Sequence, residues 1–369
     1  MNLSKFDINT NVRLSDFIGL RWALIAVGLV IGGGVGLYEY FVGHLLATSN
    51  VIVWTTPLIT YWFLALSSTG ISMLLAYGML AGNHKVTDHT RYLLVLDLAL
   101  LLGGFTALAA ELGSIPNMIY IMLSPNPMSP IWWMGNFYSV KLVLVAIKLV
   151  RELMGVHGKV DRPLAWATLA VSAAAAMTIG AALGTAIGRP DYQGVFTSLL
   201  ILSIALISGP AWLVMLRRNT ELAMHVNGVT RQIAGVVAVL LLLNLIYDLR
   251  ATTEGLQGWV HPVMPLLFAA AAIAGGAVPR IAGAMMLLGS FWVLFTSTIT
   301  GQLWVLGAMT SFHGEIASFS LNFGEIGTFV LGMAVAAAFY NLGKVFLLEH
   351  DAGTGASPAV AEPSGSAPA

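Results

Sequence analysis

The amino-acid sequence predicts an all-α membrane protein with about ten transmembrane helices. Of its 369 residues, 57% are hydrophobic and only 9% are charged, whereas soluble domains carry about 25% charged residues. The mean hydropathy is correspondingly high, at +0.83. The apolar residues also form long runs, and a run of roughly 20 such residues is what a helix needs to cross the hydrocarbon core of a bilayer.

The expected membrane spans follow one another with short polar breaks between them. The narrowest break, Pro279-Arg280, separates the eighth span from the ninth. We expect the helices to pack as two bundles. The ten spans cover residues 20–42, 53–81, 92–114, 134–155, 164–187, 193–216, 230–249, 259–278, 281–305 and 326–348.

Two further segments flank the expected membrane domain, which covers residues 20–348. Residues 1–19 are polar and mixed in charge, and no small-residue cleavage site follows them, so they are typical of a retained cytoplasmic leader. Residues 349–369 are rich in Ala, Gly, Ser and Pro, a composition that predicts a disordered tail.

Lysine and arginine predict which way the chain crosses the membrane, because basic residues in short loops concentrate on the cytoplasmic side. With the N-terminus inside, only Arg189 and Arg250 of the 17 basic residues fall clearly outside, and Lys141 lies within a span. Both termini are therefore predicted to be cytoplasmic. The residues assigned to the cytoplasmic side are Lys5, Arg13, Arg21, Lys85, Arg91, Lys148, Arg151, Lys159, Arg162, Arg217, Arg218, Arg231, Arg280 and Lys344.

Composition also excludes several kinds of chemistry. The sequence contains no cysteine, which excludes disulfides, thiolate nucleophiles and cysteine-ligated iron–sulfur or zinc centres on this chain. Its net charge is zero, which argues against nucleic acid as a partner. The eight histidines offer no pair of facing imidazoles at mid-depth, so we expect no haem, no other metal site and no covalently bound cofactor.

The connection between the third and fourth spans, residues 111–135, is the most unusual stretch. It carries no charge after Glu111, and the predicted topology places it on the outer face. An uncharged connection of this length is more typical of a docking surface or cavity lining than of a solvated loop. The expected docking residues are Asn126, Ser129, Pro130, Trp132 and Trp133, of which the tryptophans are also typical of interfacial anchors.

Three stretches in residues 53–216 contain recognisable motifs. The first is the W-x-x-P helix start at 54–57, with a small-residue patch at 67–70. The second is the acidic-L-G turn at 111–113, followed by the N-x-x-S-P re-entry at 126–130. The third is the R-P-D-Y helix start at 189–192. In this order and spacing, the three stretches resemble the NrfD/PsrC-like (polysulfide reductase NrfD) family of integral membrane subunits.

The resemblance implies a non-catalytic membrane subunit of a respiratory oxidoreductase in the inner (cytoplasmic) membrane of a prokaryote. Such a subunit exchanges electrons between a membrane quinone, menaquinone or ubiquinone, and a docked ferredoxin-like iron–sulfur subunit. A molybdopterin-containing subunit usually completes the complex, and some members are thought to translocate protons. The quinone-site residues implied by position are Trp54, Thr55, Thr56, Glu111, Tyr138, Asp191 and Tyr192.

The chain departs from the family pattern at two places. Many quinol-reactive members have a histidine near the start of the W-x-x-P helix, where this chain has Thr55 and Thr56. Members also often have a tyrosine in the equivalent of the fifth span, where this chain reads Met-Thr-Ile-Gly at 177–180. Some ten-span members act as a second, proton-related subunit without a quinone, and this alternative stays open.

Charged residues within or at the edge of the spans are candidates for a proton path, because a charge in the membrane is costly without a partner. For Lys141 we expect an ion pair with an acid such as Glu111. For Asp97, the alternative to a proton-path role is a pair with Arg91. The proton-path candidates are Glu39, Asp97, Glu111, Lys141, Asp248 and Glu325, the last of which also begins a span, where a carboxylate favours the helix N-terminus.

Two other classes of protein are compatible with this pattern. A secondary transporter would suit ten spans with scattered acids, although no internal repeat relates residues 20–190 to 190–348. A purely structural membrane anchor is the third possibility. The respiratory subunit is the preferred interpretation because it accounts for the uncharged outer connection as well as for the acids.

Overall fold

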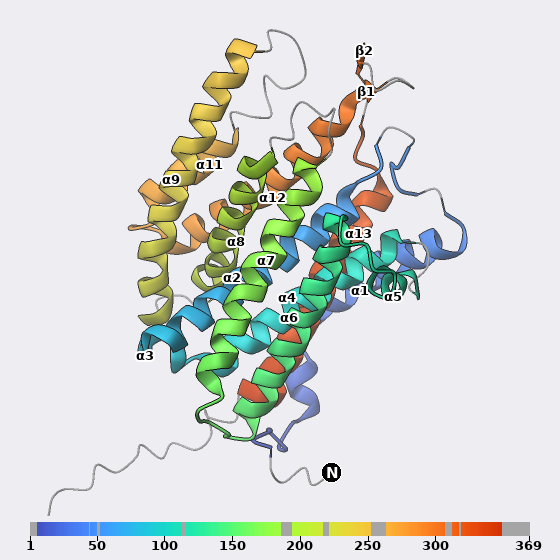
Figure 1. Ribbon diagram of the computed structural model, residues 1–369. Coiled ribbons are helices and arrows are strands. Elements are labelled where there is room, and N and C mark those ends of the chain that lie inside the picture. The colour runs from blue at the N-terminus through green and yellow to red at the C-terminus, as the bar shows by residue number, and fades with distance from the viewer. Residues whose placement is uncertain are drawn as a thin grey trace, which may run out of the picture.

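The computed structural model describes residues 6–43, 45–49, 52–112, 116–185, 194–216, 221–251, 263–306, 312–316 and 319–348. Within these residues the chain is an all-α, multi-pass membrane protein (Figure 1). Nine of the described helices are long and apolar enough to cross a membrane, which confirms the predicted fold class. Residues 349–369, where a disordered tail is predicted, lie outside the described residues.

The helices follow one another along the chain with short connections. The spanning helices are α1 (Leu20–Phe41), α2 (Thr56–Ala81), α4 (Thr90–Glu111), α6 (Pro130–Leu153), α7 (Asp161–Gly184), α8 (Gly194–Leu216), α9 (Glu221–Ala251), α12 (Pro279–Leu303) and α13 (Phe323–Gly343). The shorter elements are η2 (Leu14–Phe17), α3 (His84–Thr87), α5 (Pro116–Leu123), α11 (Val263–Ala274), the strands β1 (Trp304–Leu306) and β2 (Phe312–Ile316), and the π-helical turn η3 (Lys344–Leu348).

Two of the predicted spans differ from the helices that the structure describes. The predicted span 259–278 contains α11, which has only 12 residues, and residues 252–262 before it lie outside the described part of the chain. Helix α9 has 31 residues and begins well before the predicted start at residue 230. Its first turns contain Glu221, His225 and Asn227, which continue the helix but are too polar to register as an apolar run.

Helix α2 is the most deeply buried span and lies at the centre of the bundle. Its residues are buried without interruption from Thr56 to Ser72. It packs against α4 and α13 and also against α7, α8 and α12, so the two expected bundles share this helix. Helices α1 and α9 expose apolar side chains such as Val30 and Leu243, as expected of surfaces that face lipid.

Local sequence signals explain where the central helices begin and end. Thr55 has an extended backbone immediately before α2, and Pro57 occupies its first turn. The helix ends at Gly82, whose φ of 64° is readily adopted only by glycine. Ser129 caps α6, because its hydroxyl accepts the backbone N–H of Trp132.

Small residues let α2 and α8 cross in close contact. A Cβ atom added at Gly70 would overlap the carbonyl oxygen of Ala205, and one added at Gly209 would come within 2.6 Å of the Gly70 backbone. Such crossings are the usual role of small-residue patches in membrane helices, because they let backbones approach. The patch at 67–70 is therefore part of a helix contact.

The leader folds over one end of the bundle. The backbone N–H of Asp7 donates to the carbonyl of Leu153 (2.9 Å), and that of Asn9 donates to the carbonyl of Phe346 (2.8 Å). The Asp7 carboxylate also pairs with Arg91 at 2.7 Å. The start of α4 and the ends of α6 and α13 therefore lie on the same side as the leader, as the predicted alternation of spans requires.

The connections at the opposite end contain short elements that the sequence does not predict. Helix α5 occupies part of the connection between α4 and α6, and the antiparallel pair β1–β2 follows α12. Neither stretch is long enough to show a clear hydrophobic periodicity, since α5 has only eight residues and the strands are shorter still. Both are too brief for a composition window to resolve.

Candidate functional site

An ion pair between Asp97 and Lys141 lies in the interior of the membrane domain. Asp97 is on α4 and Lys141 is on α6. The Nζ atom of Lys141 lies 2.8 Å from Oδ1 of Asp97, and the two side chains are 0% and 1% exposed, respectively. The structure thus brings together two of the predicted proton-path residues.

Two serines of α2 complete the surroundings of this pair. The hydroxyl of Ser68 donates to Oδ1 of Asp97, and the hydroxyl of Ser72 donates to Oδ2. The ammonium of Lys141 also donates to the Ser68 oxygen. Ser68 and Ser72 are four residues apart and therefore share one face of α2. A buried ion pair needs such additional hydrogen bonds to offset the loss of hydration.

The partners of these charges differ from those expected from the sequence. Lys141 pairs with Asp97 and not with Glu111, because Glu111 lies about 21 Å further along α4 at 1.5 Å per residue. Arg91, the alternative partner for Asp97, instead pairs with Asp7 of the leader. The interior pair is therefore isolated from both expected partners.

Tyr138 is fully buried beside the ion pair, one helical turn before Lys141 on α6. Its hydroxyl lies 3.5 Å from that of Thr69. Its ring contacts Tyr61 edge-on, with centroids 5.8 Å apart, and Tyr61 in turn stacks on Phe105 of α4. Tyr138, one of the predicted quinone-site residues, is therefore enclosed by protein side chains.

A second group of buried polar side chains holds the start of α2. Glu325, in the first turn of α13, is 0% exposed. Its two carboxylate oxygens accept the backbone N–H groups of Ala47 and Thr56, each at 2.7 Å. The carboxylate thus lies at the N-terminus of α2 as well as at that of its own helix, α13.

Gln302, near the end of α12, holds the residues just before α2. Its Oε1 accepts the backbone N–H groups of Val53 (2.8 Å) and Trp54 (2.9 Å), and its Nε2 donates to the carbonyl of Trp54 (2.8 Å). Three backbone groups are therefore satisfied by one amide. The W-x-x-P segment owes its shape to residues that are far away in the sequence.

Glu111, the last residue of α4, also lies at the start of α2. Its carboxyl group lies beside the backbone amides of Thr55 and Leu58 and close to the carboxylate of Glu325. Its Oε2 atom is buried and has no hydrogen-bond partner among the described residues, as is also true of the hydroxyls of Thr55 and Thr56. The predicted candidates Thr55, Thr56, Glu111 and Glu325 therefore converge at the start of α2.

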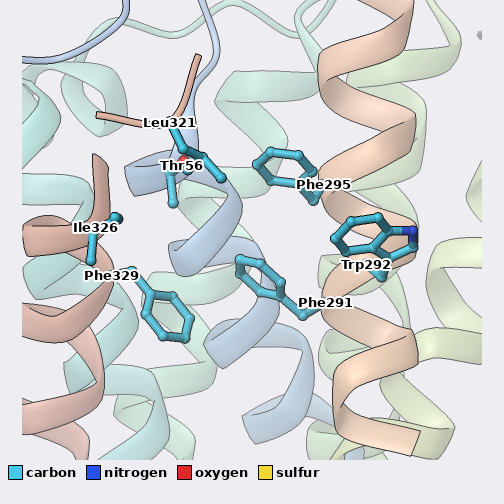
Figure 2. A pocket seen from close by; sticks show the side chains of 7 residues that line it. All are labelled: Thr56, Phe291, Trp292, Phe295, Leu321, Ile326 and Phe329. Carbon is cyan, nitrogen blue, oxygen red and sulfur yellow. The ribbon is translucent and has the colours of Figure 1, made fainter. Parts of the chain in front are cut away.

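An apolar pocket lies next to Thr56, at the start of α2 (Figure 2). Its volume is 210 Å³. Figure 2 shows the aromatic side chains of α12 and Phe329 of α13 around the space, with Thr56 at its edge. The residues that line it are Thr56, Phe291, Trp292, Phe295, Leu321, Ile326 and Phe329.

Other predicted residues have local roles or lie outside the description. Glu39 accepts the backbone N–H of Leu45 at 2.8 Å and so holds the turn after α1. The structure describes the backbone of Asp248 but not its side chain, and Asp191 and Tyr192 lie outside the described residues.

The predicted docking residues form a compact turn before α6. The backbone N–H of Ser129 donates to the carbonyl of Asn126 (2.9 Å), and the indole N–H of Trp133 donates to the carbonyl of Pro127 (2.9 Å). Ser129 and Pro130 then begin α6 as its cap and first residue. The N-x-x-S-P stretch therefore has a structural explanation, while Met128 at its tip is 90% exposed.

Three residues of these sites could not be assigned from the sequence. Ser72 and Gln302 lie in apolar runs and show their partners only after folding. The predicted topology assigns Lys148 to the cytoplasmic side, but it lies within α6 and is only 5% exposed. The spacing in the sequence does indicate this position, because residues 141 and 148 are two helical turns apart and therefore share one helix face.

These features define a class of protein: an all-α, multi-pass membrane protein with a buried aspartate–lysine pair and, at the start of α2, a buried Glu325, a half-buried Glu111 and an apolar pocket. Among the residues that the structure describes, no three His, Asp or Glu side chains group in a way that could hold a metal ion. Comparison with models of known protein families and with curated proteins finds no match.

Proposed function

We propose that this chain is the membrane subunit of a respiratory electron-transfer complex of the NrfD/PsrC-like kind, and that it exchanges electrons with a quinone at the pocket beside α2. The observation that carries this proposal is an aromatic pocket whose wall includes Thr56, the residue whose backbone N–H donates to the buried carboxylate of Glu325. The resemblance of residues 54–57 to the family's motif supports the same location, since Thr56 lines the pocket, and Glu111 of the second motif lies beside the backbone of Thr55 and Leu58.

The pocket suits the ring of a quinone such as menaquinone or ubiquinone. An apolar cavity of about 150 Å³ is large enough to bind benzene, so a volume of 210 Å³ has room for one substituted ring. The side chains of Phe291, Phe295 and Phe329 offer faces and edges to a flat ring. The surface that the pocket presents is apolar, and the buried hydroxyl of Thr56 behind it has no hydrogen-bond partner among the described residues.

The neighbouring carboxylates supply the proton chemistry of the reaction. Oxidation of a quinol breaks two O–H bonds and releases two protons together with two electrons. Glu111 has an oxygen without a hydrogen-bond partner in the described structure, and Glu325 binds the backbone of Thr56 at the pocket wall. We propose that these acids receive the protons, while the electrons pass to an iron–sulfur partner.

The connection between α4 and α6, which contains α5, supports docking of that partner at the same end of the bundle. It follows Glu111 directly and exposes Tyr120, Leu123 and Met128 by 62%, 68% and 90%. We propose that a ferredoxin-like iron–sulfur subunit, with a molybdopterin-containing subunit beyond it, covers this surface at the outer face of a prokaryotic inner membrane.

A pocket-filling substitution tests the proposed quinone site. Ile326 lines the pocket and is 51% exposed, so Ile326→Trp should fill the space without disturbing the carboxylates. We expect the dissociation constant for a short-chain quinone, measured by tryptophan quenching or calorimetry, to rise at least tenfold. Leu24→Trp on the exposed face of α1 is the matched control. Equal quinone affinity in both variants would contradict the site.

The buried Asp97–Lys141 pair supports a second function, proton conduction, in the same subunit. Proton relays in membrane proteins are built from buried ionisable side chains that face the bundle interior, and this pair satisfies that description. Asp97→Asn should therefore lower proton flux across liposomes that contain the chain. A transporter would instead be indicated by flux of another solute that depends on Asp97.

A further inference from the structure

Lys148 is buried in α6 without a visible partner. Its side chain is 5% exposed, and its Nζ atom has no hydrogen-bond partner in the described part of the chain. It follows Lys141 by two helical turns, about 10.5 Å along the axis, on the same helix face. An amine in such a position is costly to protonate without a nearby negative charge.

Three charged side chains lie near enough to interact with Lys148 through space: Asp97 of α4, Lys141 of its own helix and Asp161 at the start of α7. Asp161 pairs with Arg151 at 2.8 Å, and these two side chains are 25% and 23% exposed. Lys148 therefore lies between a partly exposed ion pair at the leader end of the bundle and the buried Asp97–Lys141 pair.

Asp97 therefore interacts with two amines: it contacts Lys141 directly, and it interacts with Lys148 through space. A proton bound at Lys148 adds a second positive charge to the surroundings of a carboxylate that already pairs with Lys141. The extra charge weakens the hold of Lys141 on its own proton by repulsion. Binding of a proton at Lys148 is thereby coupled to the state of the interior pair.

We propose that Lys148 takes up protons from the cytoplasmic side and passes them to the Asp97–Lys141 pair. In one cycle, an N–H bond of the Lys141 ammonium first breaks and its proton leaves toward the outer side; an N–H bond of the Lys148 ammonium then breaks, an O–H bond forms on Asp97 and breaks again, and an N–H bond forms on the neutral Lys141 amine. Lys148 returns to the amine, and no electrons move. This inference rests on the proposed proton conduction and adds to it the residue that supplies the interior site.

Proton flux in liposomes tests this role. The chain, purified with the partners it retains, is reconstituted with a pH-sensitive dye inside, and a potassium diffusion potential drives proton movement. Lys148→Met should reduce the flux at least tenfold. Lys148→His should retain flux, which should increase as the pH falls through the imidazole range near about 6.5. Lys159→Met removes an exposed lysine at the same end of the bundle and should leave the flux unchanged.

The outcomes separate this inference from the proposed function. If Asp97→Asn abolishes flux but Lys148→Met does not, only the role of Lys148 is wrong. If the wild-type chain and Asp97→Asn give the same flux, the proton-conducting function fails and the role of Lys148 fails with it. If Lys148→His and Lys148→Met lose flux equally while both keep the wild-type thermal midpoint, Lys148 is not a proton carrier.

Discussion

The carboxylate of Glu325 accepts the backbone N–H of Thr56 at 2.7 Å, across 269 positions of sequence. Its other oxygen accepts the N–H of Ala47 at the same distance. One fully buried side chain therefore fixes the last span, the connection after the first span and the start of the central helix. The pocket between α2, α12 and α13 depends on that arrangement.

Glu325→Gln should destabilise the protein. The carboxylate has two oxygens and accepts two backbone N–H groups, whereas the amide has one oxygen and one NH₂ group, so one backbone N–H loses its acceptor. An unsatisfied buried donor costs about 1–3 kcal/mol. We expect a lower thermal midpoint in detergent and faster hydrogen exchange at Ala47 or Thr56. Glu221→Gln changes a carboxylate that is 73% exposed and should leave both measurements unchanged. A Glu325 variant as stable as the wild type would contradict the assigned contacts.

Lys141→Met should be strongly destabilising, because it leaves the Asp97 carboxylate buried without its cation. Removal of one partner of a buried ion pair typically costs about 3–5 kcal/mol. The double variant Lys141→Met with Asp97→Asn leaves no unpaired charge, so it should be more stable than Lys141→Met alone. Thermal denaturation of the purified chain measures the difference. A double variant less stable than the single one would show that the two residues act independently.

Ser68→Ala should cost more stability than Ser72→Ala. Ser68 binds both Asp97 and Lys141, whereas Ser72 is seen to bind Asp97 alone. Each lost hydrogen bond to a charged group is worth about 1.5–3 kcal/mol. Ser67→Ala is the matched control, because the Ser67 hydroxyl is buried next in sequence without a hydrogen-bond partner among the described residues. Equal effects at Ser67 and Ser68 would contradict the geometry.

The sequence predicts the fold well because membrane spans are defined by long apolar runs. The starts of α2 and α6 follow from Pro57 and Pro130, and both helices lie within a few residues of their predicted ranges. The polar first turns of α9 are missed, because an amphipathic surface helix does not raise the local hydropathy.

The site is predicted only in part, because charge alone does not identify a partner. The sequence selects Asp97, Lys141, Glu111 and Glu325 as costly to bury. It cannot tell that Asp97 and Lys141 meet, since that depends on the packing of α4 and α6 against α2. The aromatic side chains of α12 look like ordinary core residues until α13 and Thr56 are placed beside them.

Labelling of single cysteines tests the predicted orientation, and the absence of cysteine makes this straightforward. Met128, between α5 and α6, and His157, between α6 and α7, are both exposed and flank the same spanning helix. In intact cells, a membrane-impermeant maleimide should label Met128→Cys and should label His157→Cys only after lysis. The reverse pattern would invert the topology and place the pocket on the cytoplasmic side.

Photoaffinity labelling with an azido-quinone tests the central claim most directly. The reagent is applied to the chain in its native membrane, and the labelled peptides are identified by mass spectrometry. The account predicts label within residues 291–295 and 326–329, and competition by unlabelled menaquinone or ubiquinone. Label confined to other spans, or label that excess quinone does not displace, would contradict a quinone site between α2, α12 and α13.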